Sequence, residues 1–124
     1  MELLVKGAAE LDLHLTPRQV ESFRVYHREL AAWNHRMNLT AIVASDGAQV
    51  RHFVDSLTVA KVIPDAVKDH GRMLDVGAGA GFPGVPLKLM FPGMHLSMLD
   101  SVGKKTSFLE PLVEILELED VDVY

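Results

Sequence analysis

Residues 74–84 read LDVGAGAGFPG, an apolar segment that runs into three glycines at alternate positions with an acid just ahead of them. Glycine has no Cβ, so a loop of this kind lets a bound ligand approach the backbone closely. Where such a loop enters a helix, the first N–H groups of the helix lack internal partners and point at the ligand. The stretch therefore predicts a nucleotide-type cofactor site at the carboxyl end of a parallel strand.

The sequence around this loop alternates between short apolar segments and helical ones. It predicts strands at 73–76, 95–99 and 121–123, and helices at 84–91 and 101–118. Strand, helix, strand in this order implies parallel pairing with right-handed crossovers, and so an α/β fold. Ser101 is the expected cap of the later helix, and Pro111 predicts a kink or break within it. Doubly wound sheets usually add more strands, so we expect the chain to be the front part of a longer protein.

Two helices are predicted ahead of the sheet. The first begins with a capping box, Thr16-Pro17-Arg18-Gln19, and the second spans about 46–61 with Ser45 as its cap. Apolar side chains of the first helix recur at helical spacing and predict core packing: Phe23, Tyr26, Leu30, Trp33 and Met37. We expect an N-terminal helical extension over 1–72 and a partial cofactor-binding domain over 73–124, joined in one compact unit.

Length and composition limit the protein class. The 124 residues suit one domain, and no apolar run approaches the length of about 20 residues that a helix needs to cross a bilayer. The chain has no cysteine, and its first residues lack the features of a signal peptide, so a cytoplasmic location is expected. The net charge is −5, and residues 73–124 hold three Lys/Arg against eight Asp/Glu. Charge alone therefore does not indicate nucleic-acid binding, and such a role would need a local basic face.

Two classes of cofactor compete for the glycine loop. Residues 79–84, GAGFPG, match the G-x-G-x-x-G pattern of dinucleotide-binding proteins. Residues 75–81, DVGAGAG, instead match the acidic loop of S-adenosylmethionine-dependent methyltransferases, and Asp100 suits ribose binding in either class. Asp75 favours the second class, because its carboxylate repels a pyrophosphate but attracts an ammonium or sulfonium group. The other interpretation of Asp75 is that it only bonds backbone at the strand end.

Beyond the glycines, the sequence resembles the RsmG family, also called glucose-inhibited division protein B. The resemblance runs from about Thr16 to the last residue. The segments that carry it are 38–40 (NLT), 51–57 (RHFVDSL), 74–87 (LDVGAGAGFPGVPL), 99–101 (LDS), 104–105 (KK) and 108–109 (FL). FPGVP after the glycines is much more specific than the glycines themselves. Members of this family are guanine-N7 methyltransferases of small-subunit ribosomal RNA.

The resemblance implies a class I methyltransferase fold, Rossmann-like, behind N-terminal helices. S-adenosylmethionine would lie over the loop and next to the acid that ends the second strand. The residues expected to bind it are Asp75, Gly77, Gly79, Gly81, Phe82, Asp100 and Ser101. Contacts with 16S ribosomal RNA are expected from Arg51, His52, Lys104 and Lys105, and the alternative is that these are ordinary solvated or structural side chains. Guanine N7 carries no proton, so the reaction needs no general base and we expect no catalytic acid–base residue and no metal.

Two other functions stay open at this point. The chain could be a truncated, non-catalytic module that binds cofactor weakly or pairs with another chain, and open sheet edges favour dimerisation. An NAD-type dehydrogenase fragment is the third hypothesis, and both Asp75 and the FPG segment at 82–84 argue against it.

Overall fold

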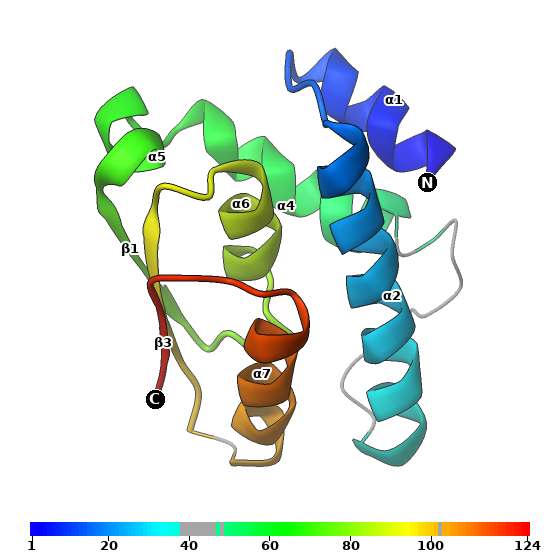
Figure 1. Cartoon of the computed structure of the whole chain (residues 1–124), viewed down its shortest axis with the longest axis vertical. Coiled ribbons are helices and arrows are strands. Elements are labelled where there is room, and N and C mark those ends of the chain that lie inside the picture. The colour runs from blue at the N-terminus through cyan, green and yellow to red at the C-terminus, as the bar shows by residue number, and fades with distance from the viewer. Residues whose placement is uncertain (38–46, 48, 102) are drawn as a thin grey trace.

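The computed structural model describes residues 1–37, 47, 49–101 and 103–124, with the side chains of residues 35–37 and 103–106 left aside. A three-stranded sheet, a middle layer of helices and an outer layer of N-terminal helices follow one another across the molecule (Figure 1). The strands lie in the order β1 (Arg72–Val76), β2 (His95–Leu99) and β3 (Val121–Val123), and all pairs are parallel. The α/β fold with a parallel sheet is therefore confirmed.

The two faces of the sheet have different environments. Leu96 and Met98 of β2 are fully buried beneath α6 (Gly84–Met90) and α7 (Gly103–Ile115), which lie on one side of the sheet (Figure 1). Leu74 and Val76 of β1 point the other way and are 60% and 68% exposed. Parallel sheets are usually covered by helices on both faces. In the described part of the chain, only one face is covered.

Helix α7 differs from its prediction at both ends. It begins at Gly103, so Ser101 does not directly precede it as the predicted cap would. It ends at Ile115 because Glu117 adopts a left-handed conformation, with φ of 54°. The N–H groups of Glu117 and Leu118 then donate to the carbonyls of Glu114 and Val113, both at 3.0 Å. This pair of bonds is a Schellman motif, which closes the last turn before residue 118.

Pro111 does not break α7, which is one helix from Gly103 to Ile115. The predicted break is therefore wrong. Proline costs a helix one backbone hydrogen bond, but this turn is fixed by packing on both sides of it. Phe108, Leu109 and Leu112 are each at most 1% exposed and belong to the central core. Their burial outweighs the missing bond.

The capping box at the start of α2 (Pro17–Met37) is confirmed. The N–H of Thr16 donates to Gln19 Oε1 at 2.8 Å, and the N–H of Gln19 donates to Thr16 Oγ1 at 3.1 Å. Three members of the predicted apolar stripe, Phe23, Tyr26 and Leu30, are fully buried. The side chain of Met37 lies outside the described residues.

Thr16→Ala removes one of these two reciprocal bonds. We expect the variant to lose about 1 kcal/mol of folding free energy, because an N-terminal N–H of α2 then lacks its acceptor. Urea unfolding followed by circular dichroism measures the change. Arg18→Ala, at an exposed position of the same helical turn, is the control and should change stability by less than about 0.5 kcal/mol. Equal losses in the two variants would contradict the capping role.

The second predicted helix is helical but irregular. Its beginning, Ser45 and Asp46, lies outside the described residues. From Gln49 on, the chain forms a π-helical turn, η1 (Gln49–Val54), a short α4 (Asp55–Leu57) and a 3-10 turn, η2 (Thr58–Lys61). Hydroxyl groups of this segment compete with the regular backbone pattern, because Ser56 donates to the carbonyl of His52 and Thr58 to that of Asp55.

Two further helices were not predicted from the sequence. Helix α1 (Glu2–Glu10) packs against η1, and the N–H of Leu4 donates to Gln49 Oε1 at 3.1 Å. Helix α5 (Asp65–His70) begins after Pro64 and leads into β1. In the part of the chain that the structure describes, none of the helices has the length and apolar character needed to cross a membrane.

Candidate cofactor site

The loop between β1 and α6 turns on three glycines with left-handed backbone. Their φ angles are 72° at Gly77, 58° at Gly79 and 100° at Gly81, which other residues adopt only with strain. The N–H groups of Gly77 and Ala78 donate to the carbonyl of Leu99, at 2.7 and 3.2 Å. The loop is thereby fastened across the carboxyl ends of β1 and β2, the edge at which parallel sheets bind their ligands.

The glycines of this loop are of two kinds. A Cβ placed on Gly77 would meet nothing within 4 Å, and one on Gly79 would meet only the carbonyl of Gly77 at 3.9 Å. A Cβ on Gly81 would lie 2.8 Å from the Tyr26 hydroxyl and from Val85, and is therefore excluded by packing. Only Gly77 and Gly79 leave bare backbone next to open space, so these two positions are the ones that a ligand can approach closely.

Asp100 lies directly after β2, next to the loop. Its Oδ2 accepts a hydrogen bond from the N–H of Gly79 at 2.8 Å, and its side chain is half-buried. Ser101 follows it and is exposed. A carboxylate beside bare glycine backbone is a suitable acceptor for ligand hydroxyl groups.

Asp75 has a different position from Asp100. It lies on the covered face of β1, is 6% exposed, and accepts a hydrogen bond from the N–H of Gly84 at 3.0 Å. Burial raises the pKa of Asp75; the bond from Gly84 lowers it in part, and the nearby Asp100 adds to the rise. The carboxylate therefore ties the start of α6 to β1. Contact with a cofactor stays a prediction for this residue.

Phe82 joins the loop to the N-terminal helices. Its ring stacks on His52, with centroids 4.5 Å apart and planes 6° apart, and on Tyr26 at 5.6 Å. Phe53 of η1 lies against the same cluster, 5.3 Å from the Tyr26 ring. The Phe82 ring is thus packed against aromatic side chains of the N-terminal helices. A contribution of this residue to cofactor binding stays a prediction.

The residues expected to contact RNA are only partly brought together. Arg51 is exposed and shares a shallow hollow with Val50, His52 and Asp55. Through its stack on Phe82, His52 connects this hollow to the glycine loop. Lys104 and Lys105 belong to the first turn of α7, but their side chains lie outside the described residues. Across the described residues, no three His, Asp or Glu side chains gather as metal ligands would.

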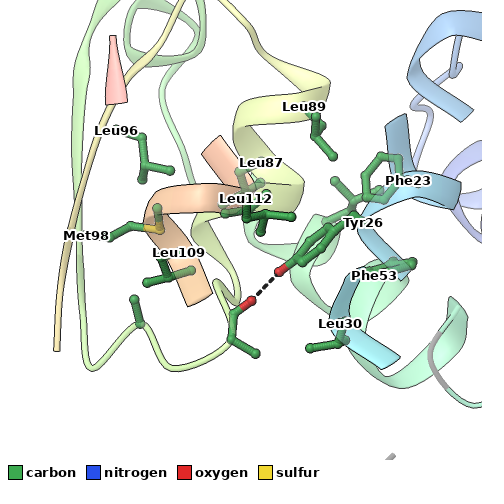
Figure 2. Close-up of a cluster of buried hydrophobic side chains, with 14 of the residues drawn as sticks. Phe23, Tyr26, Leu30, Phe53, Leu87, Leu89, Leu96, Met98, Leu109 and Leu112 are labelled. Carbon is green, nitrogen blue, oxygen red and sulfur yellow. Dashed lines mark hydrogen bonds between the residues drawn. The ribbon is translucent and has the colours of Figure 1, made fainter. Parts of the chain in front are cut away.

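The apolar stripe of α2 predicts Tyr26 as a core residue, but the stripe alone does not predict its polar contact. The Tyr26 hydroxyl donates to the carbonyl of Ala80 in the glycine loop at 2.6 Å, and Figure 2 shows this bond crossing from α2 to the loop. A buried tyrosine hydroxyl needs a hydrogen-bond partner, so a tyrosine within an apolar stripe is the signal that could have indicated such a bond.

The parallel sheet, the glycine loop after β1 and the acid after β2 define a Rossmann-like α/β protein, of which the chain has the first half. The family described as rRNA small subunit methyltransferase G (GidB) matches residues 19–124, and the chain belongs to this family.

Curated relatives agree with this assignment. Three of them are named "Ribosomal RNA small subunit methyltransferase G". They come from Geotalea uraniireducens (strain Rf4), Roseiflexus sp. (strain RS-1) and Bacillus subtilis (strain 168), and are 46%, 45% and 41% identical to this chain. These alignments cover 98%, 99% and 97% of the chain but 53%, 51% and 49% of the relatives. The chain thus spans about half the length of the curated relatives it matches.

Proposed function

We propose that this chain holds the S-adenosylmethionine half-site of a methyltransferase. The observation that carries the proposal is the bare backbone of Gly77 and Gly79 beside the Asp100 carboxylate, at the carboxyl ends of β1 and β2. Gly77 and Gly79 would admit the cofactor against the backbone, and Asp100, with Ser101, would bind its ribose. Gly81 and Phe82 would hold the conformation of the loop, and we propose that they also contact the cofactor.

Charge supports a cationic cofactor over a dinucleotide. Asp75 and Asp100 both lie at this edge of the sheet and are close enough for the charge of Asp100 to raise the pKa of Asp75. Two carboxylates repel a pyrophosphate and favour an ammonium or a sulfonium group. An NAD-type function is therefore disfavoured by the described residues as well as by the sequence.

For the whole protein we propose methylation of N7 of a guanine in 16S ribosomal RNA, in the cytoplasm. When bound, S-adenosylmethionine supplies an electrophilic methyl group. Guanine N7 has a lone pair and no proton, so no side chain of this chain has to act as a base, and the task of the protein is alignment. Arg51, His52, Lys104 and Lys105 are the proposed RNA contacts. Of these, His52 contacts the glycine loop through its stack on Phe82, and Arg51 shares a hollow with His52.

Calorimetric titration of the chain with S-adenosylmethionine, S-adenosylhomocysteine and NAD tests the proposal. We expect the first two to bind and NAD to bind at least about tenfold more weakly, a difference of 1.4 kcal/mol or more. Circular dichroism on the same sample shows that the chain is folded. Preferential binding of NAD would overturn the methyltransferase assignment for this site, and a folded chain that binds none of the three would remove the half-site proposal.

A non-catalytic interaction module is the second candidate function. The open sheet face supports it, because Leu74, Val76 and Leu99 are 60%, 68% and 42% exposed. Val76 is the register partner of Leu99, and Leu74 lies two residues before Val76 on the same face of β1. Exposed apolar surface of this kind is typical of contact sites between chains or segments. Binding of none of the three ligands by a folded chain would favour this function over the first.

A further inference from the structure

We propose that Tyr26 is a positioning residue for the cofactor loop, acting from the N-terminal helix α2 through its hydrogen bond to Ala80. This inference rests on the proposed function, because it assigns to α2 the task of holding the loop at which the cofactor would bind. The residue touches the loop from the buried side and is not offered as a contact with the cofactor.

The geometry of the contact supports this role. Ala80 stands between Gly79 and Gly81, and its carbonyl accepts the Tyr26 hydroxyl at 2.6 Å. The hydroxyl also occupies the place that a Cβ on Gly81 would need, at 2.8 Å. Tyr26 is fully buried and Ala80 is 5% exposed, so water has little access to replace the bond. A single side chain thus fixes two neighbouring positions of the loop.

The Tyr26 hydroxyl stays protonated and can therefore donate this hydrogen bond. Burial raises the pKa of Tyr26 well above its usual range, and the Asp75 carboxylate raises it further. The phenol therefore keeps its proton at neutral pH and can donate it to the loop. Stacking on Phe82 and contact with Phe53 hold the ring itself in place.

Helix α2 is also hydrogen-bonded to the C-terminal end of α6, the helix that follows the glycine loop. Gln19 Nε2 donates to the carbonyls of Leu89 and Met90, at 3.2 and 3.3 Å, where α6 ends. Helix α2 therefore forms hydrogen bonds with the loop through Tyr26 and with the end of α6 through Gln19. The conformation of the glycine loop depends on a helix outside the α/β sheet, as well as on its own glycines.

Tyr26→Phe removes the hydroxyl and leaves the stacked ring, so it isolates the bond. In the ligand-free variant we expect amide exchange at Gly79, Gly81 and Phe82 to quicken by about tenfold, the equivalent of one lost hydrogen bond. The affinity for S-adenosylmethionine should fall by a similar factor. The amide of Leu96, which donates to the carbonyl of Asp120 just before β3, reports global opening and shows how much of the rise is a loss of overall stability.

Thr58→Val is the matched control, because it also removes one hydroxyl-to-carbonyl bond, that to Asp55, in a helical segment away from the loop. It should change neither the loop exchange nor the affinity. Unchanged loop exchange in Tyr26→Phe would overturn the proposal. Unchanged affinity for S-adenosylmethionine would overturn it too, because Tyr26 would then support only global stability. Failure of the unaltered chain to bind S-adenosylmethionine would remove the proposed function, while the exchange rates would still decide the role of Tyr26.

Should Tyr26→Phe not fold, fluorotyrosine labelling of the unaltered chain replaces it. The sequence has two tyrosines, so Tyr124→Phe assigns the two fluorine signals. The signal of Tyr26 should shift when S-adenosylmethionine saturates the site. A Tyr26 signal that does not move would overturn the positioning role.

Discussion

Gly77→Asn should abolish binding of S-adenosylmethionine and leave the chain folded. Asparagine tolerates the left-handed backbone better than most residues, and a Cβ at this position meets nothing within 4 Å, so the fold has little reason to resist the change. The new side chain would fill the space through which the cofactor approaches the backbone. We expect the dissociation constant to rise at least about a hundredfold, or 2.7 kcal/mol, in calorimetric titration.

Gly81→Ala is the contrasting variant, because the same kind of substitution should here damage the fold. The added methyl group would lie 2.8 Å from both the Tyr26 hydroxyl and Val85, and 3.3 Å from Leu109, on backbone with φ of 100°. Overpacking together with backbone strain predicts a loss of about 2–4 kcal/mol in urea unfolding. If Gly77→Asn unfolds the chain and Gly81→Ala leaves stability intact, the division of the glycines into ligand-facing and packing positions is wrong.

This division explains how far the sequence could predict the site. The motif indicated a loop that needs glycine, and all three positions have left-handed backbone. It could not indicate which glycine faces the ligand and which faces the core. That depends on Tyr26 and Leu109, which are far from the loop in sequence and meet it only after α2 and α7 have packed.

The fold was predictable where the pattern is local. The capping box of Thr16 and Gln19 needs only four neighbouring residues, and each predicted strand lies within one residue of its observed bounds. At Pro111 the local rule predicted a kink or a break, and the break is absent because burial of the neighbouring turns holds α7 together. Lys88 is a similar case: it is 1% exposed, and its ammonium donates to the carbonyls of Pro92 and Met94. Charge alone would have placed this lysine in solvent.

Asp75 is the second residue for which we expect large effects, and they should differ between two substitutions. Asp75→Leu leaves the N–H of Gly84 without its acceptor in a buried site, and should cost about 1–3 kcal/mol of folding free energy. Asp75→Asn keeps an oxygen that can accept this bond and removes the buried charge. At neutral pH we therefore expect the asparagine variant to be at least as stable as the unaltered chain in urea unfolding.

The pH dependence follows from the raised pKa of Asp75. Burial shifts this pKa upward from 3.8 in the folded chain, so the folded state keeps its proton to higher pH than the unfolded state does. Where the folded state binds more protons, stability falls as pH rises. The contribution of Asp75 is thus most favourable at low pH, declines as pH rises from about its ordinary pKa through its raised value, and is constant above that. Asp75→Asn should lack this decline. A stability difference that grows in favour of the unaltered chain as pH rises would contradict the upward shift.

The same comparison connects stability to function. A buried carboxyl group that the fold would tolerate better as an amide needs another reason to be present, and buried groups with shifted pKa values are concentrated at functional sites. If Asp75 serves the cofactor through its charge, Asp75→Asn should bind S-adenosylmethionine at least about tenfold more weakly despite its retained stability. Equal affinity in Asp75→Asn and the unaltered chain would limit the role of Asp75 to its hydrogen bond with the N–H of Gly84. Asp100 would then be the acid on which the proposed site depends.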